Sequence, residues 1–166
     1  MADKDQVIKE KLDHSGLFNF SALYNYAHSW YKNEEYGVVE EKYSERVSGS
    51  TKSLLIEWKA SKRFSDYFKI EQKIVFEISD MSDVEVEVDG KKSKMNKGKV
   101  SVEVKGVLVR DPDSAWDAKP FYKFIRDVYN KYIIPGRVDV MEDKVRSDVK
   151  DFKEQIKAFL ELSGKR

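Results

Sequence analysis

The spacing of apolar residues changes twice along the chain, and each change marks a boundary between helix and strand. From Phe20 to Tyr31 the apolar positions fall three and four residues apart, which is the spacing of one face of an α-helix. From Val39 to Val109 they alternate with polar residues, the period of a strand with one buried face. Beyond Phe121 the three-and-four spacing returns. The pattern therefore predicts a helix, several strands and further helices, in that order.

Local signals set the limits of the first helix, which is predicted to run from about Phe20 to near Glu35. Asn19 or Ser21 would cap its start, because a side-chain oxygen there accepts a hydrogen bond from a free backbone N–H of the first turn. The preceding residues 6–13 are few enough to suit either a strand or a helical turn, and we favour a strand.

Alternating residues predict five further strands, at residues 39–47, 54–60, 68–78, 84–88 and 100–109. Each has one apolar and one polar face, which excludes a parallel sheet covered on both faces and predicts an antiparallel one. The last two strands are expected to form a hairpin whose connection runs from Asp89-Gly90 to Gly98-Lys99. Gly106 interrupts the alternation and is expected to mark a bulge.

Two helices are predicted after the sheet. The first covers Phe121 to Tyr132. Pro135-Gly136, just beyond it, interrupts the helical pattern before the second helix. The second is a long amphipathic helix from Val138 to Leu160. Its charged residues pair with opposite charges four positions away, as Lys144 does with Asp148, which predicts an exposed, self-paired face.

The whole chain, residues 1–166, is expected to form one α+β domain. Its elements would be an antiparallel sheet of five or six strands, an N-terminal helix and two C-terminal helices packed on one face. This order resembles the helix-grip arrangement of START-like domains, in which a long last helix closes a curved sheet over a cavity. The resemblance implies a carrier of an apolar small molecule, and the extra helix at residues 121–133 departs from it.

Four stretches resemble a family of small archaeal proteins of unknown function. They are Gly16-Leu-Phe-Asn-Phe20, Ser65-Asp-Tyr-Phe-Lys69, Lys94-Met-Asn-Lys-Gly98 and Lys131-Tyr-Ile-Ile-Pro-Gly-Arg137. The resemblance implies no activity. The composition agrees with it, because charged residues make up 37% of the chain and such dense, balanced charge is typical of thermophilic and small archaeal proteins.

The overall charge excludes a whole-molecule field that would favour nucleic acid or membranes, because 31 Lys and Arg residues meet 30 Asp and Glu residues. The chain has no cysteine, which excludes disulfide-dense secreted proteins and thiolate zinc sites. Its first residues are charged where a signal peptide would be apolar, and no apolar run approaches the length of a membrane span. We therefore expect a cytoplasmic protein with no membrane span and no cofactor.

The first candidate site is a cluster of lysines at the tip of the predicted hairpin. Its residues are Lys91, Lys92, Lys94, Lys97 and Lys99. Five projecting ammonium groups could meet the phosphates of a nucleic acid or an anionic surface, with an affinity that falls steeply with salt. No aromatic residue lies among them to stack on bases, so such binding would be directed at the backbone. The alternative is a solvated loop that resists aggregation.

Carboxylates precede this tip on one side of the strand, at Asp83, Glu85, Glu87 and Asp89. A register that pairs Val88 with Val100 would place Glu85 opposite Glu103, a like-charge pair that a cation could relieve. A flat strand spreads its carboxylates apart, however, whereas calcium needs six to eight converging oxygens. The two histidines of the chain are far apart and have no cysteine beside them, so no metal site is predicted.

The second candidate site gathers aromatic side chains from the helices and the sheet. Its residues are Tyr24, His28, Tyr31, Trp58 and Phe124. Such side chains line ligand pockets, with polar tips that orient the ligand, but they also fill the space between a sheet and its helices. Core filling is the favoured interpretation. His28 could serve as a general base, although its place at the edge of an aromatic helix face is more typical of a packing residue.

No catalytic residue can be assigned from the sequence, because it contains no glycine-rich phosphate loop, His-Glu-x-x-His helix or Gly-x-Ser-x-Gly turn. We favour a non-enzymatic binding or scaffold domain that acts on a macromolecular partner through the sheet surface or the lysine-rich hairpin tip. The alternatives are a helix-grip-like carrier of an apolar small molecule and an enzyme that uses carboxylates.

Overall fold

The computed structural model describes residues 3–110, 121, 124 and 134–164. The elements along the chain are β1 (Asp3–Phe18), α1 (Phe20–Asn33), β2 (Gly37–Ser48), β3 (Thr51–Arg63), β4 (Phe68–Val88), β5 (Lys91–Arg110) and α3 (Ile134–Gly164). The strands form one antiparallel sheet in the order β1-β5-β4-β3-β2. The predicted α+β class is therefore confirmed, and the residues before the first helix form a strand.

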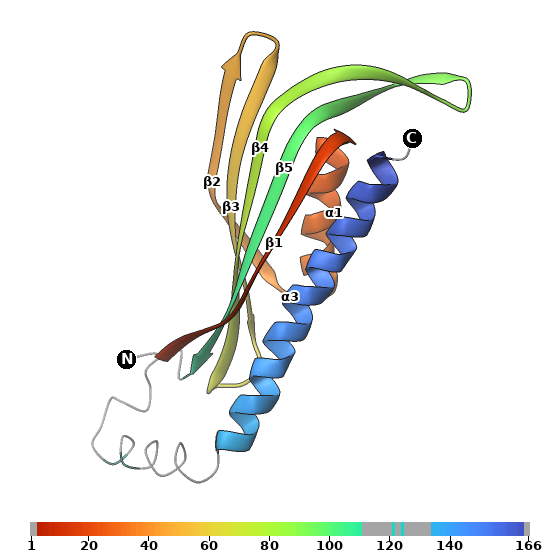
Figure 1. Ribbon diagram of the computed structural model, residues 1–166. Coiled ribbons are helices and arrows are strands. Elements are labelled where there is room, and N and C mark those ends of the chain that lie inside the picture. Colours follow the sequence, from red (N-terminus) through yellow and green to blue (C-terminus); the bar gives the residue numbers. More distant parts are fainter. Residues whose placement is uncertain (1–2, 111–120, 122–123, 125–133, 165–166) are drawn as a thin grey trace.

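Both helices lie on the same face of the sheet (Figure 1). α3 packs along β1 and β5, and α1 contacts α3 and β2. We call the face against the helices the inner face and the opposite one the outer face. The helix predicted at residues 121–132 lies outside the described residues except for Phe121 and Phe124. Neither described helix combines the length and the apolar character that crossing a bilayer requires.

The inner face carries the hydrophobic core. The central buried residues of α3 recur three and four positions apart, as predicted: Val145, Val149, Phe152, Ile156 and Leu160. Aromatic rings meet them from the other elements, and the ring centroids of Tyr31 and Phe152 are 4.7 Å apart. On the sheet, Trp58 packs edge-on against Phe76 at 4.8 Å. Side chains therefore fill the space between the helices and the sheet.

Gly106 of β5 lets α3 approach the sheet closely. A Cβ atom at this position would stand 2.5 Å from Cγ1 of Val145 and 2.9 Å from Cγ2 of Val149. The buried alternation of β5 continues through Gly106, so the bulge predicted there is wrong. The register shift lies in the partner strand β1, between Gln6 and Ile8.

β4 and β5 are longer than predicted, because a turn of two residues joins them at Asp89 and Gly90. Both turn residues have positive φ, 53° and 79°, as a type I′ hairpin turn requires. The long predicted connection is therefore wrong, since β5 already begins at Lys91. Glu85 lies opposite Lys94, and the like-charge pair expected for Glu85 does not form.

The far part of this hairpin curves over the ends of the helices (Figure 1). The register of β4 shifts between Ser79 and Ser82, and Asp80 between them has a positive φ of 54°. We call residues 83–97 the distal arm. The bend separates the arm from the sheet that carries the core.

The helix ends follow local chemistry. The side-chain oxygen of Asn19 accepts a hydrogen bond of 3.0 Å from the backbone N–H of Ala22, so the predicted cap is confirmed. Pro135 lies in the first turn of α3, where its missing N–H leaves no helical bond unmade. α3 therefore begins before Val138, the start that the sequence predicted.

Candidate functional site

The outer face carries a row of lysines that crosses four neighbouring strands. Lys9 of β1 lies opposite Lys105 of β5. Lys105 lies opposite Lys73 of β4, and Lys73 lies opposite Lys59 of β3. We call these four residues the lysine row. Like charges that stand directly opposite each other destabilise a sheet, so the row is unfavourable for the fold alone.

Glu103 neutralises only part of the row. One of its carboxylate oxygens lies 3.6 Å from Nζ of Lys9 and 3.9 Å from Nζ of Lys105. Lys73, in the middle of the row, forms no ion pair with any residue that the structure describes. Long, exposed contacts of this kind contribute about 0–1 kcal/mol. The ammonium groups therefore remain available to a partner.

Glu71 is shared among three lysines at the other end of the face. Its carboxylate oxygens lie 3.6 Å from Nζ of Lys59, 3.5 Å from Nζ of Lys4 and 3.4 Å from Nζ of Lys69. One negative charge thus serves three positive ones, which leaves an excess of positive charge here as well.

The outer face as a whole has an excess of positive charge. Its paired positions below the bend carry eleven cationic residues: Lys4, Lys9, Lys11, Lys42, Arg46, Lys59, Arg63, Lys69, Lys73, Lys99 and Lys105. The carboxylates at such positions number five: Asp13, Glu57, Glu71, Glu77 and Glu103. Eleven positive charges against five negative ones leave six, whereas the whole chain has a net charge of +1. The balanced composition therefore hides a segregated surface.

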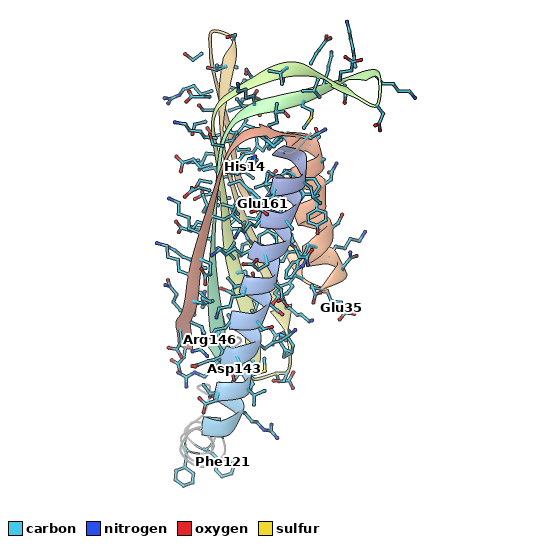
Figure 2. The ribbon with its side chains drawn as sticks, turned by 45° about the vertical axis from the view of Figure 1, so that its right-hand side comes forward. His14, Glu35, Phe121, Asp143, Arg146 and Glu161 are labelled. Carbon is cyan, nitrogen blue, oxygen red and sulfur yellow. The ribbon has the colours of Figure 1, made fainter. Side chains whose placement is uncertain are left out.

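The same positions contain no aromatic residue. Their larger apolar members are all aliphatic: Val39, Leu55, Val75, Val107 and Val109. Figure 2 shows side chains projecting from the sheet on the side away from the helices. The outer face is therefore a hydrated cationic surface without rings that could stack on a base or a sugar.

The lysines predicted to form a loop tip lie in β5 instead. Lys92 lies opposite Glu87, and Lys94 lies opposite Glu85. The distal arm holds as many carboxylates as lysines, namely Asp83, Glu85, Glu87 and Asp89 against Lys91, Lys92, Lys94 and Lys97. The fifth lysine of the predicted cluster, Lys99, belongs to the outer face of the sheet. The predicted cluster is thus divided, and the distal arm that holds four of its lysines has no net charge, because four carboxylates offset them.

Three of the five residues predicted to line an aromatic pocket lie together. The ring centroids of Tyr24 and His28 are 5.1 Å and 5.8 Å from that of Trp58, both edge-on. Tyr31 is fully buried and contacts α3 instead. Phe124 is 65% exposed. Trp58 is only 1% exposed, so the rings around it pack against one another, as the core-filling interpretation requires.

A buried polar cluster lies between α1, β4 and α3. The hydroxyl of Tyr31 donates to Oε1 of Gln72 at 2.8 Å, and the hydroxyl of Tyr36 donates to Oδ2 of Asp148 at 2.6 Å. Nζ of Lys144 lies 2.9 Å from Oδ1 of Asp148. Asp148 is 3% exposed, so the prediction that it lies on an exposed helix face is wrong. The cluster holds α3 against the sheet.

Burial controls the protonation of this cluster. Desolvation raises the pKa of Tyr31 well above its usual value. Desolvation and the hydrogen bond to the carboxylate of Asp148 raise the pKa of Tyr36. Both hydroxyls therefore remain protonated and keep donating their hydrogen bonds at any ordinary pH.

Two open grooves flank β1 near His14. One, of about 310 Å³, lies between β1 and α3 and includes Lys153 and Glu161. The other, of about 480 Å³, lies on the β5 side and includes Lys99. Figure 2 shows His14 close to the end of α3 that carries Glu161. Nε2 of His14 is already within 3.0 Å of the carbonyl oxygen of Leu17, and in the described ranges no three metal-ligating side chains converge.

Sequence reasoning missed the lysine row, because its members are distant in the chain and only the strand register brings them together. Comparison of the chain with protein-family models, with curated proteins and with solved structures finds no match.

Proposed function

We propose that this chain is a non-enzymatic binding domain that holds an anionic macromolecule against the outer face of its sheet. The lysine row is the observation that carries the proposal, because four ammonium groups stand opposite one another across four strands. Each like-charge pair costs the fold some stability. A partner with closely spaced negative charges would remove this repulsion when it binds, which favours the bound state.

The charge around the row supports the same conclusion. Six excess positive charges lie on a chain whose net charge is only +1, so the remaining residues carry a net negative charge. Such a division orients the molecule as it approaches a polyanion and increases the rate of association at low salt.

The other surfaces have less support. On the distal arm, Lys92 and Lys94 already lie opposite carboxylates. A carrier of an apolar molecule would need an internal space, whereas Trp58, Tyr31 and Phe152 are each at most 1% exposed and fill the region between the helices and the sheet.

Two variants with equal changes in charge test the proposal. The row variant replaces Lys9, Lys59, Lys73 and Lys105 by Gln, and the arm variant replaces Lys91, Lys92, Lys94 and Lys97 by Gln. Each variant is applied at low salt to immobilised heparin, duplex DNA and vesicles rich in phosphatidylserine. We expect the parent protein and the arm variant to be retained on at least one of these polyanions, and the row variant to bind it about 10-fold or more weakly.

Circular dichroism and thermal melting of both variants provide the control for folding. Equal losses in the two variants would show that binding depends on total charge and not on the row. Failure of the parent protein to bind any of the three polyanions would also refute the proposal.

A further inference from the structure

We infer that the outer face binds the phosphate backbone of a double-stranded nucleic acid and does not read its sequence. This inference rests on the proposed function and names the class of its partner. Three features carry it: the type of cation on the face, the absence of aromatic rings, and the width of the lysine row.

Lysine dominates the cationic residues of the face. Only Arg46 and Arg63 among the eleven are arginines. Interfaces between proteins are enriched in Tyr, Trp and Arg and depleted of Lys. Lysine carries a compact, hydrated charge that meets phosphates without a fixed geometry. The composition therefore fits a phosphate backbone better than an acidic protein.

The absence of aromatic rings separates a duplex from a single strand and from a membrane. Proteins that bind single strands stack the bases on aromatic side chains, and the paired positions of the outer face offer none. Amphipathic segments that lie in a membrane interface also carry Trp, Phe or Leu, and these side chains enter the bilayer. Among the paired positions of this face that the structure describes, Val39 is the one apolar residue that is strongly exposed.

The row has a width similar to that of a DNA groove. Neighbouring strands lie about 4.8 Å apart, so three spacings put the backbones at Lys9 and Lys59 about 14 Å apart. The major groove of B-form DNA is about 12 Å wide. The two end lysines are thus placed to contact phosphates of the two strands that border one groove, with Lys73 and Lys105 between them.

The side chains in the row do not suit base recognition. Bases in the major groove are distinguished mainly by bidentate contacts, which Arg makes with guanine and Asn or Gln with adenine. The row contains only lysines, and its next neighbour across β2 is Val39. Binding is therefore expected to depend on salt and on the duplex form, and to be independent of sequence.

Fluorescence anisotropy of the full chain tests this inference. The labelled probes are a duplex of about 20 base pairs, one strand of it alone and a duplex of scrambled sequence. Vesicles of phosphatidylserine and phosphatidylcholine are assayed in parallel by cosedimentation. If four phosphates are contacted, affinity for the duplex falls about 100-fold between 50 and 200 mM salt. The row variant should lose most of this salt dependence, and the arm variant should keep it.

The expected pattern is tighter binding to both duplexes than to the single strand or the vesicles, with the two duplexes equal within about threefold. Tighter binding to vesicles or to the single strand, lost in the row variant, would overturn this inference and leave the proposed function standing. A preference of about 10-fold or more for one duplex sequence would also overturn it. If the protein binds neither these polyanions nor heparin, both the inference and the proposed function fail.

Discussion

The two faces of the sheet follow opposite rules, although consecutive residues of each strand alternate between them. On the inner face, Trp58 is 1% exposed and packs edge-on against Phe76. On the outer face, the next residue, Lys59, lies opposite another lysine, Lys73. The inner face therefore supplies the stability of the fold. The outer face keeps a repulsive arrangement, which we propose is relieved by contact with an anionic partner.

Two consecutive residues of β3 should differ most in their contribution to the free energy of unfolding. Trp58→Ala should lower the free energy of unfolding by about 3–5 kcal/mol, because it removes a large buried ring from the core. Lys59→Ala should change it by less than about 0.5 kcal/mol. Chemical denaturation measures both. Similar losses in the two variants would contradict the division of roles between the faces.

A smaller loss is expected where α3 meets β5. Gly106→Ala should destabilise the protein by about 1–3 kcal/mol through overpacking, because the added methyl group would stand 2.5 Å from Cγ1 of Val145. Ser101→Ala, on the outer face of the same strand, is the matched control and should have little effect. Stabilisation by Gly106→Ala would mean that α3 does not approach the sheet this closely.

Alkaline pH tests the core that packs against the inner face, because the buried Tyr31 of α1 and Tyr36 of the turn after it have raised pKa values. Their pKa in the unfolded chain is about 10, so above that pH the folded state binds more protons than the unfolded state. The contribution of these two tyrosines to stability should be constant below about pH 10 and should then fall by about 1.4 kcal/mol per pH unit for each tyrosine. Tyr36→Phe should remove the share of Tyr36, measured by denaturation at several alkaline pH values. An unchanged slope would contradict the burial of its hydroxyl.

The smallest expected effect is a gain in stability. Lys73→Gln removes repulsion from two neighbouring lysines and should raise the free energy of unfolding by about 0.5 kcal/mol. Lys94→Gln is the matched control, because Lys94 lies opposite Glu85 and its loss removes an attraction. Measured at low salt, the two changes should have opposite signs. A loss of stability in Lys73→Gln would show that the row stabilises the fold.

The spacing of apolar residues along the chain predicted the helices, the strands and the face of each that is buried. The apolar spacing within α1 and α3 and the alternation along β3 depend on local periodicity, and the structure confirms them. The hairpin was predicted less well, because the lysine-rich stretch after Gly90 lacks the apolar alternation of a half-buried strand. Asp89-Gly90 itself is a strong signal for a two-residue turn, and its use would have given the observed register.

The lysine row and the buried cluster could not be predicted from the sequence. Each depends on which strands are neighbours, and the register of the row also depends on bulges such as the one between Gln6 and Ile8 in β1. A slip of one residue would move a lysine of the row to the other face. The bond from Tyr36 to Asp148 joins residues 112 positions apart, and no local pattern indicates it.

Chemical modification of lysines distinguishes the row from the distal arm in a single experiment. The full chain is acetylated under limiting reagent, with and without duplex DNA at low salt, and the rate at each lysine is measured by mass spectrometry. We expect Lys9, Lys59, Lys73 and Lys105 to react more slowly when DNA is present, while Lys91, Lys92 and Lys94 react at unchanged rates. Protection of the distal-arm lysines with no protection of the row would contradict it.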